Sequence, residues 1–114
     1  MPPGHDQDRL RRAIDAAERV LIHDHAVGEL GDDTVADLYA DAVRYGIVRI
    51  REAASGFSPA VGRADPRIRW GEVAALADAL AEAEPARVRA AVRAELPDLL
   101  RLARGLEARG ALDG

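Results

Sequence analysis

Apolar residues recur at intervals of three and four positions along most of the chain, which is the spacing of a stripe along one side of an α-helix. The first stripe lies between about residues 8 and 25 and consists of Leu10, Ala13, Ile14, Ala17, Val20 and Leu21. The second lies between about Thr34 and Ala54 and includes Val35, Leu38, Tyr39, Ala42, Val43, Ile47 and Ile50. The pattern therefore predicts two long helices. We expect a turn over Val27 to Asp33 between them, with Asp33 as the N-cap of the second helix.

The second half of the chain keeps this spacing but is interrupted by glycine and proline. Two residues of each kind occur between Ser55 and Arg67, so we expect an irregular loop there. A third helix is expected from Trp70 to Glu84, with an inner face of Trp70, Val73, Ala74, Leu76, Ala77 and Leu80. A fourth is expected to begin at Pro85 and to continue the stripe to Leu106. Pro97 either bends this helix or splits it into two helices that meet at Leu96.

These elements predict an all-α fold, an antiparallel bundle of four or five helices. No alternating run of Val, Ile and Thr indicates a strand. We expect the helical domain to span residues 8–109, with a disordered tail over residues 1–7 and a second tail over residues 110–114. Gly46 lies inside the second predicted helix, where glycine costs about 1 kcal/mol relative to alanine. Because an interior glycine usually has a packing reason, we expect another helix to cross closely at this position.

Composition narrows the classes of function. The chain has 114 residues and no cysteine, which excludes disulfides, thiolate metal sites and thiol catalysis. It has no apolar run of the length that a membrane span needs, and we expect a cytoplasmic protein with no membrane partner. Its formal net charge is -4, and every basic side chain is an arginine. An acidic protein is a poor electrostatic match for nucleic acid, which argues against RNA as a partner.

Several short motifs follow one another in the order and spacing of a known family. Residues 68–73 have the pattern I-x-W-x-E-V, and Leu76 and Leu80 follow on the third predicted helix. Residues 93–99 read R-A-E-L-P-D-L, while residues 41–45 and 51–54 read D-A-V-R-Y and R-E-A-A. Over about residues 9–108, the chain thereby resembles the HepT-like branch of the HEPN superfamily.

This resemblance implies a helical bundle that forms a homodimer and acts as the HEPN half of a HEPN/MNT toxin-antitoxin pair, with an MNT-type nucleotidyltransferase as partner. Active relatives cleave RNA without a metal ion, through an R-N-x-x-x-H motif followed by a tyrosine. The positions of the Arg, Asn and His correspond here to Ala77, Asp78 and Glu82, and Glu84 lies near that of the tyrosine. The motif is therefore degenerate.

The chemistry of the degenerate motif agrees with a loss of activity. Cleavage of this kind needs a group that exchanges protons near neutral pH and a cation that stabilises the developing phosphorane charge. Asp78, Glu82 and Glu84 supply neither, and their negative charge repels phosphate. We therefore assign no catalytic residue.

Two groups of side chains have the residue types of metal ligands. In His23-Asp24-His25 the two imidazoles point in different directions on a helix end, where a solvated histidine is favourable. Asp78 and Glu82 are four residues apart and would hold a divalent ion only with a second pair from a dimer mate. We therefore assign no metal ion and no cofactor.

The expected interaction surfaces follow from the remaining charged and aromatic residues. Arg87, Arg89 and Arg93 form a basic run, and we expect an exposed face on which they pair with Glu82, Glu84 and Glu95. The expected partner or dimer face consists of Trp70, Tyr39, Tyr45 and Gly46.

Three interpretations of function remain open. The first is an inactive HepT-like subunit that dimerises and binds a nucleotidyltransferase. The second is an active HEPN ribonuclease whose functional residues have relocated, for instance to Arg44, Tyr45 or Arg87. The third is a stand-alone structural or regulatory helical protein.

Overall fold

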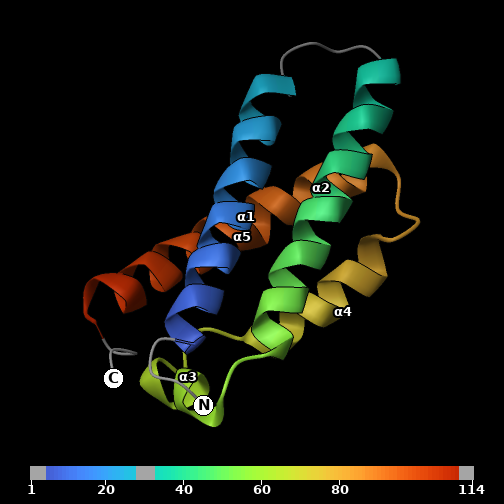
Figure 1. Ribbon diagram of the computed structural model, residues 1–114. Helices are drawn as coiled ribbons and strands as arrows, with labels where there is room; N and C mark the ends of the chain where they lie inside the picture. The colour runs from blue at the N-terminus through green and yellow to red at the C-terminus, as the bar shows by residue number, and fades with distance from the viewer. Residues whose placement is uncertain (1–4, 28–32, 111–114) are drawn as a thin grey trace.

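The computed structural model describes residues 5–27 and 33–110, and these residues form five helices (Figure 1). The helices are α1 (His5–Val27), α2 (Asp33–Ser55), α3 (Pro59–Ala64), α4 (Trp70–Leu80) and α5 (Pro85–Ala108). No strand occurs in these residues, so the predicted all-α bundle is confirmed. Most of the predicted turn between the first two helices lies outside the described residues, as does the side chain of Asp33, the predicted N-cap.

The long helix α2 is the centre of the bundle. It packs against α1, α4 and α5, and α5 also packs against α1. Figure 1 shows α1 and α2 side by side, with α5 crossing behind both of them and α4 beside α2. The helices turn most of their apolar stripes inward, but Leu38, which was predicted in the second stripe, is 65% exposed. The fully buried side chains include Leu10, Ile14, Val20, Tyr39, Val43, Ile47, Ile50, Leu80, Val88, Leu96 and Leu106.

The first helix begins earlier than predicted. Residues 5–7 belong to α1, so the predicted disordered tail over residues 1–7 extends too far. The side chain of Asp6 accepts hydrogen bonds from the backbone nitrogen of Ser58, at 2.9 Å, and from its hydroxyl. Burial raises the pKa of the Asp6 carboxyl, but these hydrogen bonds outweigh it and lower the pKa below its ordinary value. The contact joins the first turn of α1 to the start of α3 and stabilises the helix from His5 onward.

The expected loop between Ser55 and Arg67 contains the short helix α3. Pro59 occupies its first turn, where a missing N–H costs no hydrogen bond. Val61 is fully buried and attaches this helix to the core. With six residues, α3 is too short to produce a recognisable helical period.

The fourth helix ends at Leu80, one turn before the predicted end at Glu84. Glu84 precedes Pro85, and a residue before proline is sterically disfavoured in the helical conformation. Its backbone is accordingly extended, with φ −65° and ψ 152°. The fifth helix then continues through Pro97, so the alternative of two separate helices is wrong. Its buried face persists on both sides of the exposed proline, at Leu96 and Leu100.

The close helix crossing predicted at Gly46 is confirmed. A Cβ atom at this position would lie 2.3 Å from Cγ2 of Val20 on α1. We expect Gly46→Ala to lower the free energy of unfolding by about 1–2 kcal/mol, because overpacking outweighs the gain of about 1 kcal/mol in helix propensity. Urea denaturation followed by circular dichroism measures this change.

Gly71→Ala is the matched control, since an added Cβ at Gly71 meets nothing within 4 Å. This control should keep or raise the stability. A Gly46→Ala protein that is more stable than the wild type by about 1 kcal/mol would show that Val20 moves aside at no cost.

Candidate functional site

The positions of the degenerate motif lie in different environments. Ala77 is buried on α4, and Asp78 is exposed with Oδ1 3.4 Å from Nη1 of Arg51. Glu82 lies beyond the end of α4 and is exposed. Asp78 and Glu82 therefore do not lie on one helical face, although their four-residue spacing suggested that they would. In the described ranges, no three His, Asp or Glu side chains gather in a way that would hold a metal ion.

The guanidinium of Arg44 closes the C-terminal end of α4. Its Nε donates to the carbonyl oxygen of Leu80 at 2.8 Å, its Nη2 donates to that of Ala83, and its Nη1 donates to Asp41 at 3.0 Å. A helix leaves its last carbonyls without partners, and arginine is well suited to bind them. Arg44 therefore has a structural role.

The other residues considered for a relocated active site do not join Arg44. Tyr45 lines a groove between α1 and α2, and neither Arg44 nor Arg87 lines that groove. Arg87 is exposed on α5. The structure therefore does not bring these three side chains together.

The central residue of His23-Asp24-His25 belongs to a buried polar cluster. The Tyr39 hydroxyl donates to Oδ1 of Asp24 at 2.6 Å, and Nε of Arg93 donates to Oδ2 at 3.2 Å. Burial, together with the hydrogen bond to Asp24, raises the pKa of Tyr39 well above its ordinary value. Both histidines are exposed, so this triplet supplies a structural carboxylate.

In the part of the chain that it describes, the structure does not contain the ion pairs that we expected for the basic run on α5. Arg93 pairs with Asp24 of α1, and the guanidinium carbon of Arg89 lies 5.2 Å from the centre of the Tyr39 ring. Within residues 5–27 and 33–110, no ion pair joins Arg87, Arg89 or Arg93 to Glu82, Glu84 or Glu95. The sequence spacing indicated an exposed run but not which helix packs over it.

The four residues of the expected partner face lie in different environments. Tyr39 is 1% exposed, so its ring belongs to the core and offers no surface to a partner. Gly46 is buried at the helix crossing, and the half-buried Trp70 packs edge-on against Phe57 with ring centres 4.8 Å apart. Tyr45, in contrast, is 65% exposed. The four residues therefore do not form one surface, and the use of Trp70 or Tyr45 by a partner stays a prediction.

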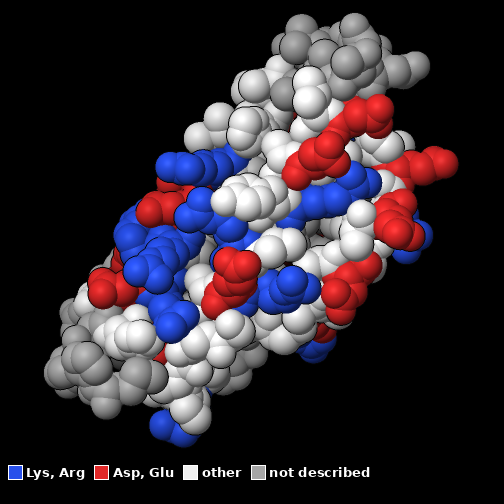
Figure 2. All heavy atoms as spheres, turned by 45° about the vertical axis from the view of Figure 1, so that its right-hand side comes forward, with Lys and Arg blue, Asp and Glu red and all other residues white. Residues whose placement is uncertain are grey.

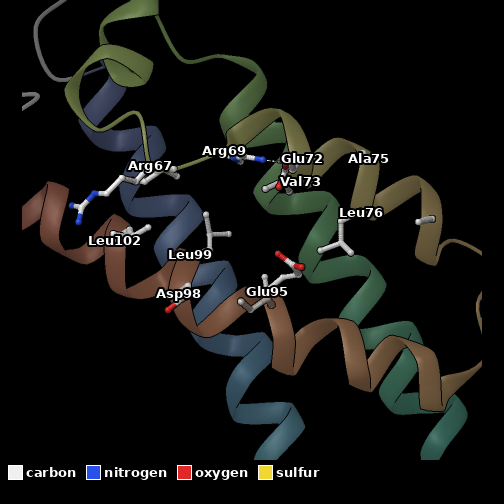
Figure 3. A pocket seen from close by; sticks show the side chains of 13 residues that line it. Arg67, Arg69, Glu72, Val73, Ala75, Leu76, Glu95, Asp98, Leu99 and Leu102 are labelled. Atoms are coloured by element: carbon white, nitrogen blue, oxygen red, sulfur yellow. Dashed lines mark hydrogen bonds and ion pairs between the residues drawn. The ribbon is translucent and has the colours of Figure 1, made fainter.

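A largely apolar groove of about 580 Å³ lies between α4 and α5 (Figure 3). It exists because α4 packs on α2 while α5 packs across α1 and α2, which leaves a gap between α4 and α5. Leu76 of α4 and Leu99 and Leu102 of α5 line it and remain partly exposed. The sequence pattern assigned Leu76 and Leu99 to the buried stripe, because the spacing of apolar residues does not tell a face that another helix covers from a face that lines an open groove.

The charges around this groove are arranged along its length. Arg67 lies at the end near Leu102, Arg69 lies beside Glu72, and the carboxylates of Asp98 and Glu95 line the α5 side (Figure 3). Arg69 pairs with Glu72 at 2.8 Å. Glu95 forms no ion pair within the described part of the chain, so its carboxylate is available at the groove surface.

The basic end of the groove is held in place by Asp65. This buried carboxylate accepts hydrogen bonds from Nε and Nη2 of Arg67, at 2.9 and 2.8 Å, and from Nη2 of Arg109 at 3.3 Å. The hydrogen bonds from Arg67 are the main reason that the pKa of Asp65 lies well below its ordinary value of 3.8. The contacts connect the segment before α4 to the end of α5.

Comparison with known proteins identifies no relative. No protein-family model, no curated protein and no solved structure matches the chain. The HepT-like resemblance therefore depends on the sequence motifs alone. Among the described helices, none has the length and apolar character needed to cross a membrane.

Proposed function

We propose that this chain is a catalytically inactive HepT-like HEPN protein that acts as the dimeric, partner-binding subunit of a HEPN/MNT toxin-antitoxin type pair. The observation that carries the proposal is the apolar groove between α4 and α5. The surroundings of Asp78 and Glu82 support the inactive state, because the nearby Arg44 is occupied by backbone carbonyls. A protein with this arrangement presents a surface for association and no centre for acid-base chemistry.

The occupant of the groove in this proposal is a second copy of the chain. A groove between two helices is a common docking surface for an apolar helix face. Leu76 and Leu99 provide apolar walls, and the ends differ in charge, with Arg67 at one end and Glu95 towards the other (Figure 3). In a two-fold dimer the same patch meets itself in reversed direction, so the basic end of one copy faces the acidic end of the other. This charge match is partial, because Arg67 is already paired with Asp65 and Asp98 lines the groove beside Leu99 (Figure 3), so the apolar walls contribute most of the contact.

Sedimentation velocity tests this dimer. The wild type should sediment at twice the chain mass of 12.2 kDa. Leu99→Glu should sediment as a monomer, because it places a charge in the apolar centre without a partner. Leu38→Glu is the matched control: Leu38 is 65% exposed and does not line the groove, so this variant should remain a dimer.

Glu95→Arg tests the same interface with a variant that should not misfold, since Glu95 is exposed and is not part of the core. It should weaken the dimer by opposing like charges at the groove ends. A monomeric wild type, or a Leu99→Glu protein that stays dimeric, would exclude this interface. Degradation of RNA by the purified wild type would contradict the proposed inactivity.

A further inference from the structure

A second groove, of about 280 Å³, lies on the face formed by α1 and α2. Its floor is made of small side chains and includes Ala16, Ala42 and Gly46, the last at the closest approach of the two helices. Longer side chains line its sides: Arg12, Arg19 and His23 come from α1, and Tyr45 and Arg49 come from α2. The depression thus follows directly from the close crossing at Gly46.

The three arginines of this groove carry uncompensated charge. Arg12, Arg19 and Arg49 form no ion pair with any carboxylate in residues 5–27 and 33–110. Neighbouring arginines on α1 and α2 behave differently, since Arg11 pairs with Asp15 and Glu18, and Arg51 pairs with Asp78. Three of the arginines of these two helices that form no ion pair in the described residues therefore line this groove, while a fourth, Arg9, contacts His5 instead.

Asp15 is the acidic residue of the groove wall, and it does not neutralise these arginines. Its Oδ1 accepts hydrogen bonds from Nε and Nη2 of Arg11, at 3.1 and 2.8 Å, and Arg11 does not line the groove. The groove is consequently electropositive although the whole chain has a net charge of -4. A positive depression on an acidic protein attracts a small anion by focusing the local field.

Tyr45 adds an aromatic surface to this positive groove. Tyr45 is 65% exposed, so much of its ring is open to solvent. The guanidinium carbon of Arg49 lies 5.7 Å from the ring centre. This cation-π contact positions the guanidinium and leaves its charge and its hydrogen-bond donors free for an anion.

We propose that the groove between α1 and α2 binds a small phosphate ester that carries a planar ring, the class represented by a nucleoside monophosphate. Guanidinium groups match phosphate oxygens through paired, charge-assisted hydrogen bonds. The tyrosine ring provides a surface on which a base stacks. The imidazole of His23 adds a hydrogen-bond donor at the α1 wall.

The charge distribution favours a small ligand over a nucleic acid strand. Figure 2 shows blue side chains interspersed with red ones on the left of the view, and further red side chains along its right-hand edge. A strand needs a basic track that follows several successive phosphates, and acidic side chains next to the groove interrupt such a track. The groove volume also suits one nucleotide, since it lies close to the lower end of the range of small-molecule pockets.

Isothermal titration calorimetry at low ionic strength tests the site with adenosine 5′-monophosphate, ribose 5-phosphate and inorganic phosphate. Adenosine monophosphate should bind about tenfold more tightly than ribose 5-phosphate because of ring stacking. Arg19→Gln and Arg49→Gln should each weaken its binding by about tenfold or more. Arg87→Gln is the matched control, because Arg87 is also exposed and forms no ion pair in the described residues, yet lies outside the groove.

Tyr45→Leu separates the two parts of the site. It should abolish the preference for adenosine monophosphate, and it should weaken the binding of ribose 5-phosphate less than Arg49→Gln does, because it removes only the contact that positions Arg49. Equal affinity of the wild type for all three probes, or equal weakening by Arg87→Gln and Arg49→Gln, would overturn the proposal. Binding of single-stranded oligonucleotides that tightens steadily with their length would also overturn it, in favour of an extended nucleic acid surface.

Discussion

Replacing Ile47 by alanine is expected to lower the free energy of unfolding by about 4 kcal/mol. Ile47 has no exposed surface and lies in α2, the helix that packs against α1, α4 and α5. The truncation removes buried methyl groups and leaves a cavity that these helices fill only in part. Because domains of this size have a total stability of about 5–15 kcal/mol, the change affects a large fraction of it. Urea denaturation followed by circular dichroism measures the difference.

Leu38→Ala is the matched control on the same helix. Leu38 is 65% exposed, and its truncation should change the stability by less than about 0.5 kcal/mol. The two variants remove side chains of similar volume, so their difference isolates burial from helix propensity. Equal effects of the two truncations would mean that α2 is not the centre of the core.

Asp24→Ala is expected to cost about 2–3 kcal/mol of stability. The substitution removes the acceptor of the Tyr39 hydroxyl, which is enclosed in the core, and the partner of Arg93. A buried hydroxyl without a partner loses its hydration and receives nothing in return. Equilibrium denaturation at neutral pH measures the loss.

A double-mutant cycle with Tyr39→Phe tests the cause of this loss. The phenylalanine variant lacks the hydroxyl, so Asp24→Ala should cost less in that background than in the wild type, by at least about 0.5 kcal/mol. His23→Ala is a control at the adjacent exposed position, and it should have little effect. Strict additivity of Asp24→Ala and Tyr39→Phe would show that the hydrogen bond contributes nothing to stability.

The long helices were predictable because their stripes extend over many turns. In α1, α2 and α5, apolar residues recur every three or four positions over several turns, which a loop sequence does not produce by chance. The close crossing predicted at Gly46 was also correct. The errors concern local ends and short segments. The extension of α1 to His5 depends on the contact of Asp6 with Ser58, which lies 52 residues away in the sequence.

The pairing of charged residues was less predictable than the helices. Arg93 and Asp24 are separated by 69 residues, and nothing in the local spacing of either one indicates the other. The same holds for Arg44, which was considered for catalysis and instead binds the carbonyl of Leu80, at the end of α4, and that of Ala83, in the turn after it. Helical spacing tells which side of a helix a residue occupies, but the partner depends on how the helices are placed against each other.

The sequence by itself determined that the chain folds into helices, which residues form most of their inner faces, with Leu38 an exception, and that residues 78–84 are rich in carboxylates. These properties depend on residue types and on spacings within single helices. Only the tertiary structure decided where grooves open, at the gap between α4 and α5 and beside the crossing of α1 and α2. The reason is physical: a groove arises from the angle and distance between whole helices, and these follow from the summed packing of side chains that are far apart in the sequence.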